Sequence, residues 1–336
     1  MKIDAPITGN MGKIGSEAKR LESLGYDGLR LAETSHDPFM PLAIAAEHTK
    51  SIELVTSVAV AFARNPLSMA MLTHDLHQFS QGRFVLGLGS QVKPHIERRF
   101  SMPWHKAAAQ MREFLQAMHA IFACWYDGER LDFVGEYYQH TLMPSTFSPQ
   151  DAQGPKPRIN LSATGPLMTK VAAELADGMI MHPFSSAKYM REVTLPAIEA
   201  GLKTSGRTLD NFELDYAPMI ATANTEEGLN KAIDMLRDRI SFYGCTVAYK
   251  PVLDIHGWGD LQDELIQLNR AHNKEAMKAL VTDEMLNTIG IVGEPAHVVD
   301  EMKKRFGGLI SRTGFSGLDL DEDTLATMLD NLKQEA

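Results

Sequence analysis

The feature that most constrains the fold is a regular alternation of short apolar segments with longer segments of helical period. The helical segments repeatedly end at Gly or Asp-Gly, as in LGYDGLRLAE and ELADGMIMH, and an apolar segment follows at once. The segments predicted as strands lie near residues 2–7, 28–33, 52–60, 83–89, 158–163, 178–182, 212–222 and 308–315. Such alternating units predict an α/β fold with a parallel sheet, and eight of them predict a (β/α)8 TIM barrel. A doubly wound open sheet is the alternative, although GLGSQV at 87–92 lacks the third glycine of a dinucleotide-binding loop.

Several helix boundaries are predicted as well. Asp37-Pro38 and Asn65-Pro66 each place a capping side chain directly before a proline, which is favoured in the first helical turn. Asn224, with Glu227 three residues later, predicts a further N-terminus. One face of a long helix is formed by apolar residues, namely Met111, Phe114, Leu115, Met118 and Phe122.

We expect a single domain over residues 1–336, with insertions at 90–105, 127–157 and 241–290. A helix at 294–306 leads directly into the last strand, so residues 223–290 are expected at the C-terminal face of the barrel, where TIM-barrel active sites lie. We interpret 241–290 as a lid over that face.

The charge balance limits the possible partners. Forty-three acidic residues outnumber 33 basic ones, giving a formal net charge of −10. Binding to nucleic acid or to an anionic membrane surface needs a basic surface and is therefore not expected. Two cysteines cannot form a disulfide framework, and MKIDAPITGN lacks the apolar stretch of a signal peptide. No apolar run is long enough to cross a bilayer, so we predict a cytoplasmic protein.

Common TIM-barrel chemistries leave signatures that this sequence lacks. It has neither His-x-His after an early strand nor His-Glu-x-x-His, so no metal site is predicted. We interpret His74 and His77, three residues apart on one helix, as part of a solvated outer face. Apart from Lys2, the strands hold no lysine for a Schiff base, and no Gly-x-Ser-x-Gly elbow or P-loop occurs.

Polar residues follow the carboxyl ends of several predicted strands. They are Glu33, Thr34 and His36; Ser57 and Arg64; Ser90 and Gln91; Ser162 and Thr164; and His182. Because these strand ends meet at the barrel's C-terminal face, the residues are candidates for the active site. For His36 and His182 a purely structural role is the open alternative, and for Asp37 and Asn65 helix capping is the preferred interpretation.

The segment SATGPLMTK at 162–170 places small residues between a strand and a helix N-terminus. Free backbone N–H groups and the helix dipole favour an anion there, and Lys170 and Arg64 could add positive charge. The segment therefore predicts a site for a phosphate-bearing ligand such as a flavin or deazaflavin. An ordinary tight strand-to-helix loop is the alternative.

These residues resemble the bacterial-luciferase-like oxidoreductases, in particular the branch that depends on coenzyme F420. The matching stretches are LGYDGLRLAETSHDPF (24–39), IELVTSVAVAFARNP (52–66), GRFVLGLGSQVKPHIERRF (82–100), RLDFVGEYYQHTLM (130–143), SATGP (162–166), LADGMIMHPF (175–184) and PVLDIHGWGDL (251–261). The resemblance implies a TIM barrel with an insertion over its C-terminal face, a homodimer or larger assembly, and hydride or oxygen chemistry on bound F420 or FMN.

The resemblance also assigns cofactor-binding residues. It places a non-proline cis peptide at Ser57-Val58, behind the central ring of the cofactor. It places the phosphate end of the cofactor at Ser162, Ala163, Thr164 and Gly165, and the ribityl chain near Gln91. An Arg before an Asn-Pro or His-Pro pair is a family feature, and here it is Arg64.

The sequence departs from the family members that oxidise sugar phosphates. Those members carry Asp-His after the second strand and Glu after the fourth, where this sequence has Glu33-Thr34 and Val92. A sugar phosphate is therefore not the expected substrate. His36 is the expected proton-handling residue, and Glu33, Thr34 and His36 are the predicted catalytic residues.

The predicted function is hydride transfer between F420 and an organic substrate. An alcohol or ketone is suggested by the aromatic residues of the lid, Phe242, Tyr243 and Trp258. One alternative is an FMN-dependent monooxygenase that uses O2 and separately reduced flavin. A flavin or F420 reductase is the expected protein partner, according to which coenzyme is bound. Others are a flavin-binding protein without turnover and an isomerase or lyase barrel acting on phosphate substrates.

Overall fold

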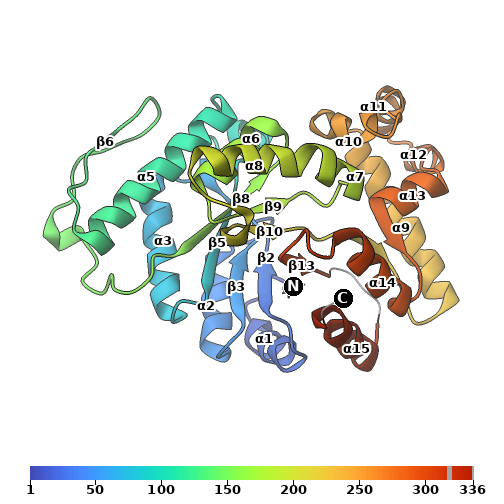
Figure 1. Ribbon diagram of the computed structural model, residues 1–336, viewed down its shortest axis with the longest axis horizontal. Helices are drawn as coiled ribbons and strands as arrows, with labels where there is room; N and C mark the ends of the chain where they lie inside the picture. The colour runs from blue at the N-terminus through green and yellow to red at the C-terminus, as the bar shows by residue number, and fades with distance from the viewer. Residues whose placement is uncertain (316–319, 335–336) are drawn as a thin grey trace.

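The computed structural model describes residues 1–315 and 320–334, and its centre is a closed barrel of parallel strands surrounded by helices (Figure 1). Neighbouring strands follow the chain order, and β13 pairs with β1 to close the ring. The barrel strands are β1 (Lys2–Pro6), β2 (Gly28–Leu31), β3 (Glu53–Thr56), β5 (Phe84–Gly89), β8 (Arg158–Ala163), β9 (Gly178–Met181), β10 (Glu213–Asp215) and β13 (Arg312–Gly314). The predicted (β/α)8 barrel is confirmed, and the open-sheet alternative is excluded.

Two of the predicted strands are each divided in the structure. The segment 52–60 consists of β3 and a short continuation, β4 (Ala59–Val60), which pairs with β5. The prediction of one strand over 212–222 is wrong, because β10 ends at Asp215 and β11 (Met219–Ala221) pairs with β12 (Gly290–Val292) outside the barrel. Pro218 lies in the break, and proline has no N–H to donate to a strand ladder.

The helices around the barrel follow from local patterns. In α1, Ile14, Ala18 and Leu21 share one buried face, and Gly25 follows with a φ of 92°. The other surrounding helices are packed in the same manner. The set comprises α1 (Ile14–Ser23), α2 (Phe39–His48), α3 (Pro66–Phe79), α5 (Ala107–Asp127), α6 (Pro166–Leu175), α8 (Leu195–Thr204), α14 (Pro295–Phe306) and α15 (Glu322–Lys333).

The predicted helix starts are confirmed in part. The Asn65 side chain accepts a hydrogen bond from Ser68 N at the start of α3, as predicted. The prediction for Asp37 is wrong by one residue, because α2 begins at Phe39 with Pro38 as its N-cap, and Asp37 accepts instead from Phe39 N. The prediction for Asn224 is wrong by one residue. Thr225 caps the helix by accepting from Gly228 N, while the Asn224 amide donates to Asp321. The cap moved because a residue distant in sequence engages the Asn224 side chain.

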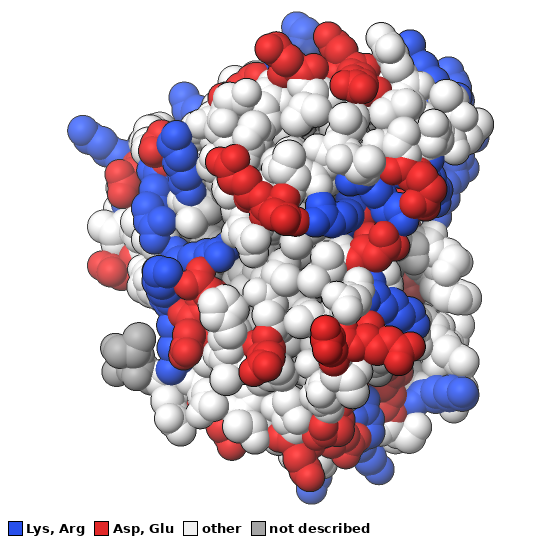
Figure 2. All heavy atoms as spheres, turned by 90° about the vertical axis from the view of Figure 1, so that its right-hand side faces the viewer, with Lys and Arg blue, Asp and Glu red and all other residues white. Residues whose placement is uncertain are grey.

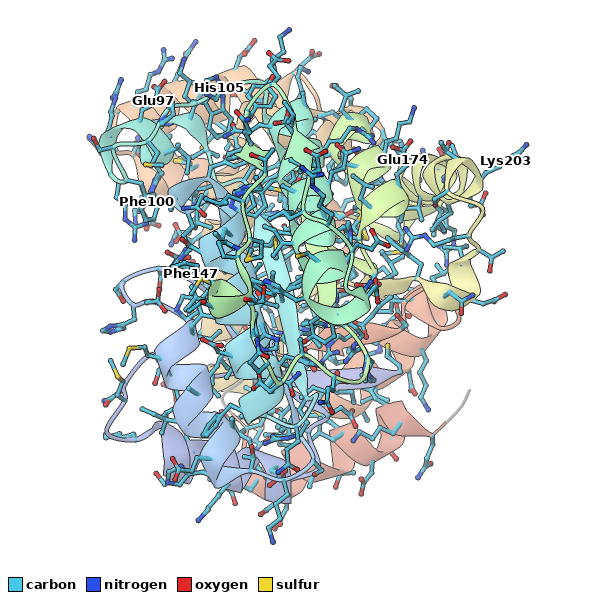
Figure 3. All side chains as sticks on the ribbon, turned by 90° about the vertical axis from the view of Figure 1, so that its left-hand side faces the viewer. Glu97, Phe100, His105, Phe147, Glu174 and Lys203 are labelled. Carbon is cyan, nitrogen blue, oxygen red and sulfur yellow. The ribbon has the colours of Figure 1, made fainter. Side chains whose placement is uncertain are left out.

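The predicted long apolar helix is α5, and its predicted apolar face is buried against the barrel. The chain then forms an arm over residues 128–157, which contains the hairpin of β6 (Phe133–Val134) and β7 (Gln139–His140). Figure 3 shows this arm and α5 on one side of the molecule, with Phe147 on the arm. A short helix, α4 (Lys93–Arg98), precedes α5.

The interpretation of His74 and His77 as a solvated face is wrong. The two residues are only 1% and 6% exposed because residues 151–155 of the arm cover this side of α3. His74 bonds to the Tyr126 hydroxyl and to Asp151, and His77 bonds to the Pro155 carbonyl. Over residues 1–315 and 320–334, no group of His, Cys, Asp and Glu is placed to hold a metal ion.

The segment after β11 packs beside the barrel as a small helical body (Figure 1). It contains α9 (Glu226–Gly244), α10 (Lys250–Asp254), α11 (Leu261–Arg270), α12 (Lys274–Ala279) and α13 (Asp283–Ile289). Its own apolar core includes Leu236, Ile240, Leu253 and Met285, and it joins the barrel through Phe184 after β9. On the face that this body presents, acidic and basic side chains are interspersed (Figure 2). None of the helices in the described part of the chain has the length and apolar character needed to span a membrane.

Charged side chains fill the part of the barrel interior toward the N-terminal ends of the strands. Arg312 is 0% exposed, and its guanidinium bonds to both carboxylate oxygens of Asp4 at 2.7 and 2.8 Å. It also bonds to Glu53 at 2.6 Å, and Glu213 lies 3.3 Å away. Because a buried charge is tolerated only when it is paired, this cluster is an ion network that fills the barrel.

Candidate active site

Small residues line the barrel axis at the C-terminal ends of the strands. Strand residues alternate between the axis and the surrounding helices, so residues two or four positions beyond the charged residues of the same strands also face the axis. Pro6 and Ala32 are exposed there, and the other members are partly exposed. This layer, which we call the barrel mouth, consists of Pro6, Ala32, Ser57, Ser162 and Ala217.

Two glycines on β5, Gly87 and Gly89, pack against the backbone between β3 and β4, where the strand is interrupted. The peptide bond between Ser57 and Val58 is cis, as the resemblance implied. The Thr56 hydroxyl bonds to both N and O of Gly87, at 2.9 and 2.8 Å, and so replaces strand-to-strand bonds at this point. A Cβ at Gly89 would lie 2.7 Å from a methyl carbon of Val58. Only glycine at these positions leaves room for the displaced backbone.

Glu33 and Arg64 are paired beside this break. A carboxylate oxygen of Glu33 accepts from Arg64 at 2.7 Å and from the backbone N–H of Val60 at 2.8 Å. Arg64 also donates to Asp37 at 2.6 Å. Burial alone would lower the pKa of Arg64, but hydrogen bonds and charge from Glu33 and Asp37 raise it. The expectation that Arg64 adds positive charge to the anion site is wrong, because two carboxylates neutralise it.

The other predicted residues of this region lie at the surface of the mouth. His36 is exposed and packs against Gly9, where an added Cβ would lie 2.6 Å from the imidazole ring. Thr34 is exposed, and its carbonyl accepts from Arg99. Gln91 is partly buried with a φ of 60°, and its amide oxygen accepts from Val92 N at 3.0 Å.

A cavity lies between the start of α6 and the segment after β9. Ala163, Thr164 and Gly165 line it, as does Ser185, whose side-chain oxygen is buried without a hydrogen-bond partner among the described residues. No side chain caps α6, so the N–H groups of its first turn are left for another partner. The opposite wall continues from α7 (Ala187–Tyr189) through a π-helical turn at Met190–Thr194. A helix N-terminus and an unpartnered buried hydroxyl together suit an anion.

The side chains lining this cavity include no Lys or Arg. Lys170, expected to contribute charge, instead lies 3.8 Å from Glu174 on the same helix. Glu174 also pairs with Arg112 of α5, and Figure 3 shows it on α6. The expectation for Lys170 is therefore wrong, because Lys170 pairs with Glu174 and is not among the residues that line the cavity.

His182 lines the same cavity and is enclosed by aromatic side chains of the helical body. Its ring stacks on Tyr249 with centroids 4.3 Å apart and meets the edge of Tyr243 at 4.6 Å. Burial, with a smaller contribution from Arg239, lowers the pKa of His182 to about 4. The backbone N–H of Phe184 donates to Nδ1 at 3.1 Å, which assigns the remaining ring proton to Nε2. His182 is thus a neutral hydrogen-bond donor at neutral pH.

The structure brings the predicted residues together in two groups. Glu33, Ser57, Val58 and Arg64 lie around the strand break, and Ala163, Thr164 and Gly165 lie at the α6 cavity with His182. Sequence reasoning missed Ser185 and the aromatic enclosure of His182. A serine three residues after a candidate histidine is the only local signal, and it is weak.

Comparisons with known proteins agree with this architecture. The luciferase-like monooxygenase family model matches residues 5–312. The uncharacterized protein Rv1360 of Mycobacterium tuberculosis is 44% identical over 312 residues, covering 93% of this chain and 92% of that protein. The 5,10-methylenetetrahydromethanopterin reductase of Archaeoglobus fulgidus is 28% identical over 296 residues, covering 85% and 83%.

Solved structures share the fold. The coenzyme F420-dependent tetrahydromethanopterin reductase from Methanopyrus kandleri has a TM-score of 0.79 at 20% identity, covering 100% of this chain and 97% of that one. The oxygenating constituent of 3,6-diketocamphane monooxygenase from Pseudomonas putida, in complex with FMN, has a TM-score of 0.67 at 17% identity, covering 100% and 97%. The chain therefore belongs to the luciferase-like monooxygenase family, whose members are F420- or FMN-dependent oxidoreductases.

Proposed function

We propose that this protein is an F420-dependent oxidoreductase that exchanges a hydride with an organic substrate at the barrel mouth. F420-dependent relatives support this choice of coenzyme. An alcohol or ketone is the proposed substrate, since the aromatic residues of the proposed lid, Phe242, Tyr243 and Trp258, favour a substrate of low charge. The main alternative is an FMN-dependent monooxygenase that receives reduced flavin from a separate reductase. A monooxygenase constituent of the same fold, solved in complex with FMN, supports this alternative.

The observation that carries the proposal is the uncharged lining of the α6 cavity. F420 joins its ring system to its tail through a phosphodiester, which carries one negative charge. FMN ends in a phosphomonoester, whose second pKa near 6 leaves it close to doubly charged at neutral pH. Helix N–H groups, the Ser185 hydroxyl and neutral His182 suit a single charge, whereas a dianion without an Arg or Lys partner would be poorly compensated.

Named residues would hold the remaining parts of the coenzyme. Ser57 and Val58 would support its ring system, and Gln91 would contact the ribityl chain. The coenzyme, when bound, supplies a carbon centre that gives or accepts hydride. His36 would give or accept the proton that accompanies hydride transfer at the substrate oxygen, because it is an exposed imidazole at the mouth.

The helical body would exclude water from the bound ligand. Tyr249 and Tyr243 already cover His182 at the edge of the cavity. We propose that residues 241–290 act as the lid, and that the protein works as a homo-oligomer with an F420 reductase as its source of reduced coenzyme.

Fluorescence titration of the purified protein with F420 and, separately, with FMN tests the proposal. Tight binding of F420 with weak binding of FMN is the expected result. Tight binding of FMN alone would overturn it in favour of a flavin monooxygenase, and binding of neither would remove both. Ser185→Ala should weaken F420 binding several-fold, since it removes a buried donor, whereas Ser16→Ala on the exposed face of α1 should not. His36→Ala should lower turnover strongly and leave coenzyme affinity almost unchanged.

A further inference from the structure

Arg30 on β2 lies above the buried ion network, at the base of the barrel mouth and level with Pro6. In the register of β1 and β2, Asp4 pairs with Gly28 and Pro6 pairs with Arg30. Arg30 is therefore one axis-facing layer nearer the C-terminal end of the barrel than Asp4. Its side chain is 12% exposed, whereas Arg312, in the layer below, is fully buried.

The two arginines use their guanidinium groups differently. Arg312 bonds to carboxylates through all three of its nitrogens. Arg30 bonds only through Nη2, to Asp4 at 2.9 Å, Asp215 at 3.1 Å and the carbonyl of Thr313 at 3.1 Å. Its Nε has no hydrogen-bond partner among the described residues. Arg30 is therefore anchored at one nitrogen and keeps donor capacity that the protein does not use.

The Nε side of the guanidinium is closed, because Nε is buried and a Cβ at Gly314 would lie only 3.0 Å from it. Among the described residues Nη1 also has no hydrogen-bond partner, and unlike Nε it is not fully buried, so Nη1 is the donor that a ligand can reach. The axis-facing residues of the mouth are small and uncharged, from Pro6 to Ala217. Like Arg64, Arg30 is paired with two carboxylates, so what it offers a ligand at the base of the mouth is a fixed hydrogen-bond donor.

We infer that Arg30 is a ligand-binding residue at the base of the active site, where its guanidinium donates a hydrogen bond to a carbonyl oxygen of the pyrimidinedione ring of the bound coenzyme. Arg30 pairs in register with Val55, two residues before Ser57, which places it directly below the strand break proposed to support that ring. When the ring is reduced and deprotonated, negative charge spreads over its N1–C2 carbonyl region, and a fixed guanidinium stabilises that form. This inference rests on the proposed function only in requiring a coenzyme with such a ring.

A charge-balanced pair of variants separates ligand binding from stability. Asp215 bonds to Arg30, and burial raises the pKa of its carboxyl group, so Asp215→Asn is a mild change that keeps Arg30 in place. The double variant Arg30→Met with Asp215→Asn then removes the guanidinium without leaving a new unpaired charge. Asp4 keeps its two bonds to Arg312 in both variants.

The affinity of each variant for oxidised and reduced coenzyme is measured by fluorescence, with F420 or FMN as the probe according to which one the unmodified protein binds. Loss of a charged hydrogen bond predicts roughly tenfold weaker binding of the oxidised form by the double variant than by Asp215→Asn, and a larger loss for the reduced form. Equal affinities in two folded variants, or equal losses for both redox forms, would overturn the inference. If the unmodified protein binds only FMN, the proposed function fails while this inference is still tested; if it binds neither coenzyme, both fail. Should the double variant not fold, Arg30→Lys with native Asp215 tests the hydrogen bond alone, because lysine retains the charge but not the guanidinium donor; it should still bind the oxidised form more weakly, and an unchanged affinity would overturn the inference.

Discussion

The enclosure of His182 predicts a pH-dependent contribution to stability. Burial against Tyr249 and Tyr243, with a smaller effect of Arg239, lowers the pKa of His182 from an ordinary 6.5 to about 4. The unfolded chain therefore takes up a proton near pH 6.5, but the folded protein does so only near pH 4. The contribution of the neutral ring is complete above pH 6.5 and is lost as the pH falls towards 4.

The size of this effect follows from the two pKa values. A pKa lowered from 6.5 to about 4 corresponds to a loss of roughly 3 kcal/mol in the free energy of unfolding, reached in full only below pH 4. Because the loss is incomplete at pH 5, the free energy of unfolding should fall by about 2 kcal/mol between pH 8 and pH 5 on account of this residue.

Urea denaturation of the unmodified protein and of His182→Asn, at pH 8 and pH 5, measures the effect. Asparagine retains an acceptor near the position of Nδ1 for the Phe184 N–H but does not titrate. The stability difference between the two proteins should shrink by about 2 kcal/mol at the lower pH. His95→Asn, on the exposed side of α4, is the control for removing a histidine as such. A stability difference that is the same at both pH values would refute the reasoning, because it would mean that His182 titrates alike in the folded and unfolded states.

Three further substitutions test the packing that supports the site. Gly87→Ala should destabilise the protein by roughly 2 kcal/mol or more in urea denaturation, because the added methyl group would overlap the Thr56 carbonyl oxygen. Glu113→Ala should make residues 136–138 more sensitive to limited proteolysis, since its carboxylate accepts their three backbone N–H groups; unchanged cleavage would contradict this role. Thr225→Ala should cost about 1 kcal/mol of stability through loss of the α9 cap, and no measurable change would mean that water replaces the hydroxyl.

The barrel was predictable because its signals are local. Apolar period, glycine stops and proline-preceding caps are properties of a few neighbouring residues, and they locate most of the strands and several helix starts, such as that at Asn65. Local signals failed where a distant residue competes for the same group. Asn224 lost its capping role because its amide reaches Asp321, and His74 is buried because the arm carrying Asp151 lies over α3.

The candidate site shows the same division between local and long-range signals. The sequence alone predicts the strand ends that carry Glu33, Ser57 and His182, and it predicts the small residues before α6 that favour an anion. Only the tertiary structure decides the electrostatics, because ion pairs and burial join residues far apart in the chain. It neutralises Arg64, encloses His182 with residues of the helical body, and leaves Arg30 partly free at the base of the barrel mouth. Whether a charged side chain serves a ligand or another side chain depends on which partner lies within a few ångströms, and that distance is set by the closed barrel.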